Sequence, residues 1–312
     1  MTRAIAPSLV AVDWGTSHLR IWLLGDDGSV VAEHGSDEGM STTPREGFHT
    51  VLEAHLAALA VPLDVPVMMC GMVGSRQGWA EARYLALPAT LADIAGGAVR
   101  IPDLPRDIFI MPGLCKPDER YPDVMRGEET QLLGLHRISP VAGDRIACMP
   151  GTHSKWVHMK DGSVTDFVTF MTGDAFAALS SHSVLRHSMA DAPVDSASPV
   201  FREAVRMSLD CPADILARLF SIRPASLLED LDPVHAKERL SGFLIGEEIA
   251  GARARLSLPA EIDIIGGEAL SALYEAALSE AGITCRIHDG KELAIAGLAG
   301  AANAMPDGAA AG

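Results

Sequence analysis

Residues 12–30 read VDWGTSHLRIWLLGDDGSV, and residues 150–164 read PGTHSKWVHMKDGSV. Both stretches carry a Gly-Thr pair, a basic residue, a tryptophan and an Asp-Gly pair in the same order. The two Gly-Thr pairs begin at Gly15 and Gly151, 136 positions apart. Solenoid repeats recur every ~20 to 50 residues, so a repeat of this length predicts two similar domains instead.

The size and composition of the chain agree with two domains. Its 312 residues exceed the length at which a single hydrophobic core usually stops growing. Hydrophobic residues make up 48% of the chain and charged residues 21%, which is ordinary globular usage and excludes wholesale disorder. We expect domains at residues 1–139 and 140–312.

Charge and cysteine usage exclude several classes of partner. The chain has 25 Lys plus Arg against 41 Asp plus Glu, a formal net charge of -16, and no polybasic run, so nucleic acid is not an expected partner. No apolar stretch is long enough for a membrane span, and none resembles a secretory leader. The cysteines are single, without a C-x-x-C pair, which predicts reduced thiols and a cytoplasmic location: Cys70, Cys115, Cys148, Cys211 and Cys285.

Apolar periodicity predicts a mixed α/β chain in which each half starts with a three-stranded antiparallel meander. In the first half the expected strands are 9–12, 19–24, 30–34, 66–73 and 108–113, and the expected helices are 48–60 and 127–138. In the second half the expected strands are 145–149, 155–159, 164–171, 261–265 and 285–289, with helical composition over 174–256 and helices at 268–282 and 292–304. Residues 80–103 give no clear pattern, and residues 306–312 are expected to fray.

The repeated turns are candidate phosphate sites. A turn whose backbone N–H groups converge beside hydroxyl groups can bind an anion, and glycine lets the backbone approach a phosphate closely. Two such turns facing each other across a cleft could hold a polyphosphate from both sides. Neither a P-loop nor a G-x-G-x-x-G motif is present. The residues concerned are Gly15, Thr16 and Ser17 in the first turn and Gly151, Thr152, His153 and Ser154 in the second.

Charged residues stand beside both turns. Asp13 precedes the first turn, where a carboxylate would repel bare phosphate but could hold Mg²⁺, which is commonly bound by one or two carboxylates plus phosphate oxygens. Arg20 and Lys155 follow the two turns and could contact the same phosphates. The alternative for Arg20 and Lys155 is a solvated strand face.

Together, DWGTSHLR and PGTHSKW resemble the superfamily of actin, hexokinase and the heat-shock chaperone ATPases. Asp13, Gly15, Thr16 and Arg20 have the spacing of the D-x-G-T-T-x-x-R pattern of its carbohydrate kinases, with Ser17 at the second Thr. This resemblance implies two ribonuclease-H-like domains with an interdomain cleft, the first carrying the phosphate-1 loop and the sugar-acid side and the second the phosphate-2 loop and the adenosine side. The stretch IDIIGGEALSALYEAA is similar to the adenosine motif, with Gly266 and Gly267 beside the nucleoside, although a tight strand-to-helix turn would also explain these glycines.

Five further stretches narrow the resemblance. MMCGMVGSRQGW, IMPGLC, VMRGEETQLLG, MPGTHSKWV and FMTGD are similar to the family of 2-dehydro-3-deoxygalactonokinases. Membership would imply ATP-dependent phosphorylation of 2-dehydro-3-deoxy-D-galactonate at its 6-hydroxyl, the kinase step of D-galactonate breakdown. The alternatives are a kinase for another keto-deoxy sugar acid and, from a different class, a non-catalytic ATP-binding protein of the same fold. The sequence does not state the oligomeric state, and an oligomer is possible.

The resemblance also implies roles for individual charged residues. Superfamily sugar kinases carry an aspartate base in a G-D-Q-like motif, and RGEETQLLG occupies that place, so Glu128 is the candidate base, with Glu129 and Asp174 as rivals. The alternative for the two glutamates is a favourable interaction with the helix dipole. Arg126 and Arg76 are candidates for the carboxylate of the sugar acid, or else members of structural ion pairs. His153 could contact phosphate or simply face solvent.

Overall fold

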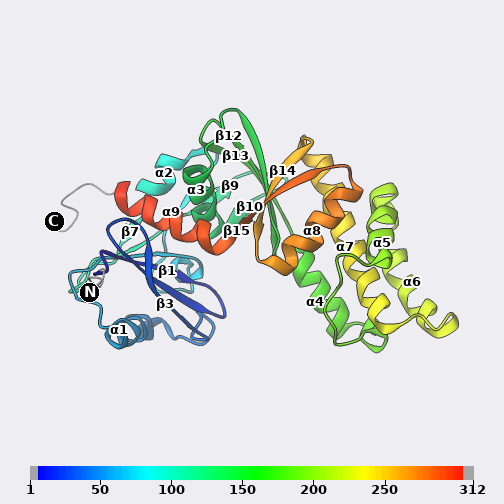
Figure 1. Cartoon of the computed structure of the whole chain (residues 1–312), viewed down its shortest axis with the longest axis horizontal. Coiled ribbons are helices and arrows are strands. Elements are labelled where there is room, and N and C mark those ends of the chain that lie inside the picture. Colours follow the sequence, from blue (N-terminus) through cyan, green and yellow to red (C-terminus); the bar gives the residue numbers. More distant parts are fainter. Residues whose placement is uncertain (1–5, 305–312) are drawn as a thin grey trace, which may run out of the picture. The chain divides into compact units, whose positions relative to one another are not determined.

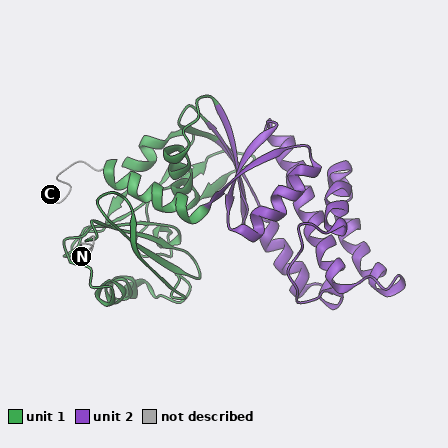
Figure 2. Ribbon diagram, viewed as in Figure 1, with its two compact units in different colours: residues 1–143, 160–165, 290–312 green, residues 144–159, 166–289 purple. Residues whose placement is uncertain are grey.

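The computed structural model describes residues 6–304, and the predicted frayed tail lies outside them. Contacts group the described residues into two compact units (Figure 2). Unit 1 comprises residues 6–143, 160–165 and 290–304, and unit 2 comprises residues 144–159 and 166–289. The expected division into domains at residues 1–139 and 140–312 rests on the sequence repeat, and it stays a prediction.

Unit 1 is built on a six-stranded sheet in the order β3-β2-β1-β4-β8-β7 (Figure 1). Strand β1 pairs with β2 and β2 with β3 in antiparallel fashion, which confirms the predicted first meander, while β4 and β8 run parallel to β1. A smaller sheet has the order β10-β9-β5. The strands are β1 (Leu9–Trp14), β2 (Leu19–Leu24), β3 (Val30–Ser36), β4 (Val67–Cys70), β5 (Tyr84–Ala86), β6 (Ala89–Thr90), β7 (Val99–Arg100), β8 (Ile108–Ile110), β9 (Gly113–Lys116) and β10 (Asp123–Met125).

The sheet of unit 2 has the matching order β15-β14-β11-β12-β13. In both units the first strand has the second and third on one side and two parallel strands on the other, so the repeat seen in the sequence extends to strand order. Short strand β6 pairs with β13 at residues 163–164. The strands are β11 (Asp144–Met149), β12 (Ser154–Lys160), β13 (Ser163–Phe170), β14 (Glu261–Gly266) and β15 (Thr284–Asp289).

Helices cover these sheets and form a separate cluster in unit 2 (Figure 1). Unit 1 contains α1 (Phe48–Ala58), α2 (Leu91–Gly96), α3 (Glu128–Ile138) and α9 (Gly290–Ala304). Unit 2 contains α4 (Thr172–His182), α5 (Pro199–Asp210), α6 (Ile215–Leu228), α7 (Pro233–Arg255) and α8 (Glu268–Glu280). Across residues 6–304, no helix combines the length and apolar character that crossing a bilayer requires.

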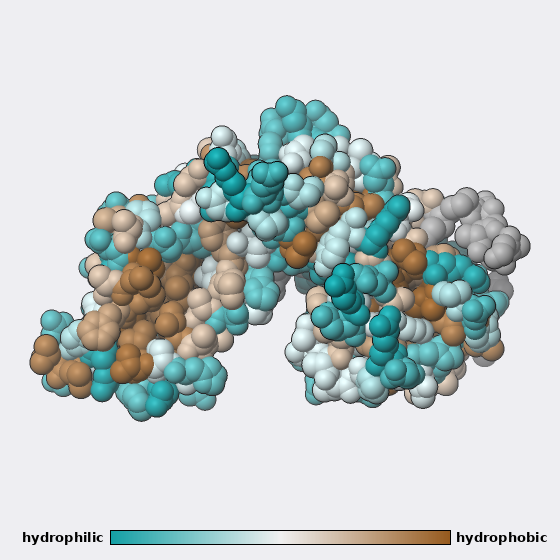
Figure 3. Space-filling view, turned by 180° about the vertical axis from the view of Figure 1, so that it is seen from behind, coloured by the Kyte–Doolittle hydropathy of each residue, from teal (hydrophilic) through white to brown (hydrophobic). Residues whose placement is uncertain are grey.

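The hydrophobic cores follow from these layers. In unit 1, Trp14, Phe48 and Ile110 belong to one buried cluster between the sheet and α1. Unit 2 has one core around its sheet and a second among α5, α6 and α7. Figure 3 shows hydrophobic residues gathered over the helical part of unit 2, where Phe220 and Leu228 of α6 are exposed.

The structure corrects two local predictions and assigns one stretch that had none. Strand 66–73 is too long, because Gly71 adopts a φ of 94° and a 3-10 turn, Met72–Gly74, follows. Strand 108–113 ends at Ile110, since Pro112 has no N–H for the ladder. Residues 80–103, which gave no clear pattern, contain α2, whose capping box joins Thr90 and Asp93. The T-x-x-D spacing of those two residues was a usable signal.

Helices α3 and α9 approach each other closely through glycine. A Cβ atom on Gly134 would lie 1.9 Å from the carbonyl oxygen of Leu293, and one on Gly297 would lie 2.0 Å from that of Thr130. The obstructing atoms belong to the backbone, which cannot turn aside as a side chain can. The start of α3, which carries both candidate glutamates, is therefore held in place by α9.

We predict that Gly297→Ala lowers the free energy of unfolding by about 1 to 3 kcal/mol or more, because the added methyl group must push α9 away from α3. Urea unfolding followed by circular dichroism measures the change. Gly96→Ala is the matched control, since Gly96 is exposed on a helix and its added Cβ would meet no atom within 4 Å. Equal stability of Gly297→Ala and the parent protein would contradict this account of the packing.

Candidate active site

The first Gly-Thr turn joins β1 to β2 and is held by the segment that follows β3. The Gly15 N–H donates to the His18 carbonyl at 2.9 Å, which closes the turn. From the other side, the Met40 N–H donates to the Gly15 carbonyl at 3.0 Å and the Ser41 N–H to the Thr16 carbonyl at 2.9 Å. These bonds fix the direction of the turn's carbonyl groups.

Close backbone contact explains why a glycine precedes Met40. A Cβ atom on Gly39 would lie only 2.3 Å from the carbonyl carbon of Ser17. By contrast, a Cβ atom on Gly15 would meet nothing closer than the His18 carbonyl oxygen at 3.7 Å. Contacts within the chain therefore require glycine at position 39 but not at position 15.

The second Gly-Thr turn has the same support. The Asp174 N–H donates to the Thr152 carbonyl at 3.0 Å. A Cβ atom on Gly173 would lie 2.5 Å from the Gly151 carbonyl oxygen, whereas one on Gly151 would meet no atom within 4 Å. In each unit, then, a glycine after the third strand packs against a Gly-Thr turn whose own glycine is not crowded: Gly15 would make only an ordinary contact at 3.7 Å, and Gly151 has open space before it. Such space suits the close approach of a phosphate.

The basic residues beside the turns differ in their surroundings. Arg20 lies opposite Asp13 in the β1–β2 register and donates to its Oδ2 at 3.1 Å. Lys155 is only 5% exposed, and its Nζ donates to the His153 carbonyl at 3.1 Å. A solvated strand face is therefore the wrong description of Lys155, which lies near the start of β12 and binds the second turn through its side chain.

Three carboxylates of unit 1 gather where β1, β4 and α3 meet. Gly71 brings β4 close to β1, since its added Cβ would lie 3.0 Å from Oδ1 of Asp13, and Gly127 approaches Gly71 in turn. Burial raises the pKa of Asp13 above its ordinary value, Arg20 opposes that rise, and the negative charge of Glu128 adds to it. A cation beside Asp13 would offset both effects that raise its pKa.

Glu128 and Glu129 are adjacent in sequence but differ in environment. Glu129 is fully buried at 0% exposure, and its Oε2 accepts from the Gly127 N–H at 2.7 Å while its Oε1 accepts from Thr130 at 3.1 Å. Burial, and to a lesser degree the charge of Glu128, raises the pKa of Glu129 to about 8. Glu128 is only partly buried, and its Oε2 accepts from the Arg126 N–H at 3.1 Å.

The two candidate arginines both contact the segment that precedes β5. Arg126 donates from Nη2 to the Ala82 carbonyl at 2.7 Å and stacks over the Tyr84 ring at 4.4 Å. Its Nε and Nη1 are buried and have no hydrogen-bond partner among the described residues. Arg76 is exposed and lies 3.4 Å from Glu81. Of the two, Arg126 has donors in need of an acceptor.

The remaining candidates belong to unit 2. Asp174 lies in the first turn of α4, and its Oδ2 is 3.9 Å from Nε2 of His153 in the second Gly-Thr turn. Both side chains are about half exposed. Gly266 ends β14 and Gly267 is the N-cap of α8. A Cβ atom on Gly266 would lie 3.7 Å from Pro150, so these glycines are neighbours of the second Gly-Thr turn.

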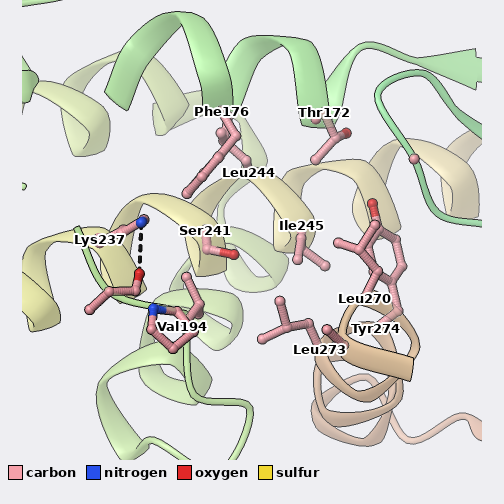
Figure 4. A pocket seen from close by; sticks show the side chains of 15 residues that line it. Thr172, Phe176, Val194, Lys237, Ser241, Leu244, Ile245, Leu270, Leu273 and Tyr274 are labelled. Carbon is pink, nitrogen blue, oxygen red and sulfur yellow. Dashed lines mark hydrogen bonds between the residues drawn. The ribbon is translucent and has the colours of Figure 1, made fainter. Parts of the chain in front are cut away.

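A cavity of about 320 Å³ opens beside that turn in unit 2 (Figure 4). Gly151 and Thr172 line one part of it, and Lys237 of α7 donates to the Ala192 carbonyl at 2.7 Å at another. Most of the wall between is apolar: Phe176, Val194, Leu244, Ile245, Leu270 and Leu273. Such a mostly apolar cavity with a few polar groups suits an aromatic ring system.

Sequence reasoning missed the residues that support the turns. Gly39 and Gly173 were not singled out, although DEGMS and FMTGD each place a glycine shortly after the third strand of a meander. The sequence patterns also did not identify Gly71 and Gly127, which both have a positive φ. The repeated position of Gly39 and Gly173 was a signal that could have been found by extending the comparison of the two halves.

Comparison with known proteins matches nearly the whole chain to one family. A family model described as 2-keto-3-deoxy-galactonokinase matches residues 13–301. "Probable 2-dehydro-3-deoxygalactonokinase DgoK1" of Rhizobium meliloti (strain 1021) is 48% identical over 296 residues, which cover 95% of this chain and 96% of that protein. The 2-dehydro-3-deoxygalactonokinase of Escherichia coli (strain K12) is 34% identical over 273 residues, covering 88% and 90%. A crystal structure of a Sinorhizobium meliloti protein bearing the same enzyme name has a TM-score of 0.92 at 48% identity and covers 95% of this chain and 98% of that one.

We predict that Glu129 makes the free energy of unfolding depend on pH. Because its pKa is about 8 in the folded protein against an ordinary 4.5, the folded state binds the proton more tightly, and stability is lost as pH rises from about 4.5 to 8. The free energy of unfolding of Glu129→Gln, measured relative to that of the parent protein, should therefore increase by a few kcal/mol as the pH rises from about 5 to 8. Urea unfolding at several pH values measures this, with exposed Glu46→Gln as the control. A stability difference that is constant with pH would contradict the prediction.

Proposed function

The chain belongs to the 2-keto-3-deoxy-galactonokinase family, and we propose that it transfers the γ-phosphoryl group of ATP to the 6-hydroxyl of 2-dehydro-3-deoxy-D-galactonate. This is the kinase step of D-galactonate breakdown. The observation that carries the proposal is the family match over residues 13–301, which includes both Gly-Thr turns. The reduced cysteines expected from the sequence favour a cytosolic enzyme.

We propose that unit 2 binds the nucleotide. The second Gly-Thr turn, with open space before Gly151, would hold phosphate oxygens through Thr152 and through its backbone N–H groups other than that of Gly151, which points at Ser154 Oγ. The cavity beside it would take the adenosine, with Gly266 and Gly267 at the start of α8 leaving room for the nucleoside. The apolar walls suit the faces of the base, and the ring of Tyr274 lies at the same cavity.

Asp13 is the proposed magnesium ligand. No group of three or more His, Cys, Asp or Glu side chains in residues 6–304 could hold a metal by protein atoms alone. One carboxylate plus phosphate oxygens is nevertheless a common way to bind Mg²⁺ in kinases. A cation there would offset the burial and the Glu128 charge that raise the pKa of Asp13, which supports the proposal. When bound, Mg²⁺ neutralises charge on the phosphates. Arg20 orients Asp13 through its bond to Oδ2.

Glu128 is the proposed base that orients and deprotonates the 6-hydroxyl. Its side chain is partly exposed, whereas Glu129 is fully buried with a pKa of about 8 and is committed to Gly127 and Thr130. A mostly protonated carboxyl cannot accept a proton at neutral pH, so Glu129 is the weaker candidate. Asp174 lies beside the second Gly-Thr turn with its Oδ2 3.9 Å from Nε2 of His153, so positioning His153 is the better proposal for it.

Arg126 and Arg76 are the proposed partners of the substrate carboxylate. The buried Nε and Nη1 of Arg126 lack a partner, and unpaired buried donors are costly. A carboxylate in contact with this guanidinium would remove that cost. Exposed Arg76 would add a second positive charge from the same part of unit 1.

The proposal includes two ribonuclease-H-like domains that bind one ATP through both Gly-Thr turns. The matching strand orders of the two units support the domain repeat. A kinase for another keto-deoxy sugar acid is the alternative within the family, and a non-catalytic ATP-binding protein is the alternative outside it. The match to kinases over nearly the whole length of each relative favours the enzyme.

Purified protein should release ADP from Mg-ATP when 2-dehydro-3-deoxy-D-galactonate is added, and more slowly with its C4 epimer or with other keto-deoxy acids. A coupled ADP assay over this panel measures kcat/KM for each acid. Preference for a different acid would favour the alternative kinase. Binding of ATP with no turnover on any acid would favour the non-catalytic protein.

We predict that Glu128→Gln lowers kcat by about 10² to 10⁴, because the attacking hydroxyl loses its proton acceptor, while the KM for ATP changes little. Steady-state kinetics with both substrates measures the effect. Asp174→Asn is the comparison variant, and it should raise the KM for ATP more than it lowers kcat. A Glu128→Gln enzyme with nearly full kcat, beside an Asp174→Asn enzyme without activity, would move the base to Asp174.

A further inference from the structure

A buried carboxylate in unit 2 has no role in the reaction described so far. Glu248 of α7 is 1% exposed and lies at the end of a helix face that also presents Lys237, Ser241 and Ile245 to the nucleotide cavity. Burying a carboxylate is costly unless several donors surround it. The hydrogen-bond donors around Glu248 explain how its carboxylate can be buried.

Those donors come from three other elements. Trp156 of β12 donates from Nε1 to Oε1 of Glu248 at 2.8 Å, and Tyr274 of α8 donates from its hydroxyl to Oε2 at 2.7 Å. The hydroxyl of Thr172 in α4 also hydrogen-bonds this carboxylate. One side chain therefore joins β12, α4, α7 and α8, the elements that surround the cavity and its turn.

The hydrogen bonds continue from Glu248 into the second Gly-Thr turn. Ser154 and Tyr274 hydroxyls are 2.9 Å apart, and because Tyr274 donates to Glu248, Ser154 donates to Tyr274. The Gly151 N–H in turn points at Ser154 Oγ at 3.4 Å. Each hydrogen bond in this series therefore donates toward the carboxylate, from the turn through Ser154 and Tyr274 to Glu248. The charged carboxylate can only accept, so it sets the direction of the whole series.

We propose that Glu248 is a positioning residue that fixes the second Gly-Thr turn against α4 and α8 and so pre-forms the nucleotide site. The inference rests on the proposed function for the identity of the ligand, but its structural basis is the network itself. Burial also raises the pKa of Glu248, as expected for a carboxylate held away from water, and the neighbouring polar groups of Thr172, Tyr274, Trp156 and Ser154 oppose that rise. Glu248 touches neither the phosphates nor the sugar acid in this proposal.

Glu248→Gln tests the direction of the chain with almost no change in shape. A glutamine has an NH₂ donor in place of one carboxylate oxygen, so it cannot accept at both positions, Oε1 and Oε2, that now bond Trp156 and Tyr274. Tyr274 and Ser154 must then reverse or lose their bonds, and the turn shifts. We expect the dissociation constant of ATP to rise about tenfold or more, the loss expected for one well-made bond to a charged group. The KM for the sugar acid should stay unchanged.

Glu238→Gln is the matched control. Glu238 lies on the same helix, is 3% exposed and accepts from Ser198 at 2.6 Å, but its partner is not part of the turn. A role limited to stability predicts that both variants lower the unfolding free energy and leave ATP affinity alone. Titration calorimetry with ATP, beside urea unfolding, separates the two roles.

Tyr274→Phe keeps the proposal testable if Glu248→Gln does not fold. It removes only the hydroxyl that links Ser154 to Glu248 and keeps the aromatic ring at the cavity. ATP affinity should fall about three- to tenfold. Unchanged ATP affinity in both variants, or an equal loss in Glu238→Gln, overturns the inference. Wild-type protein that binds ATP but turns over no acid refutes the proposed function and leaves the Glu248 test intact.

Discussion

Backbone-to-backbone packing against the two Gly-Thr turns is the contact on which the candidate site depends. Gly39 lies against Ser17 and Gly173 against Gly151, each at a distance that excludes any Cβ atom. The adjoining N–H groups of Ser41 and Asp174 bind the threonine carbonyls of the turns. These bonds fix the carbonyl groups of each turn, and the proposed function places phosphate on the opposite side of the turn.

The two units support their turns by different means beyond this shared contact. In unit 1 the supporting segment is anchored by the indole of Trp14, which donates to the Glu38 carbonyl at 2.8 Å. In unit 2 the anchor is a buried carboxylate, Glu248, with donors from β12, α4 and α8. The repeat has thus kept the glycine and the strand order while the surrounding polar groups diverged, as expected if backbone geometry is the stricter constraint.

Burial divides chemically similar residues into different roles. Glu128 and Glu129 share a helix start, yet only Glu129 is sealed from water, and its pKa of about 8 follows from that. Gly297 lets α9 pack closely on α3 at Thr130, whose hydroxyl donates to Glu129. This packing helps to exclude water from the Glu129 carboxylate. A helix from the end of the chain thereby influences which of two adjacent carboxylates remains available for chemistry.

Local patterns in the amino-acid sequence were sufficient for the meander of β1, β2 and β3, for most helices and for the two Gly-Thr turns, because hydrophobic period and turn residues act over short distances. The resemblance carried by the motifs also led to the family that the comparisons identify. Residue roles within the site stay predictions, but their environments were set by contacts between distant segments. Burial of Glu129 and Lys155, the constraint on Gly39 and Gly173, and the network around Glu248 each need partners far along the chain. Periodicity and spacing cannot report such partners, because they describe a residue's neighbours in sequence and not those it meets after folding.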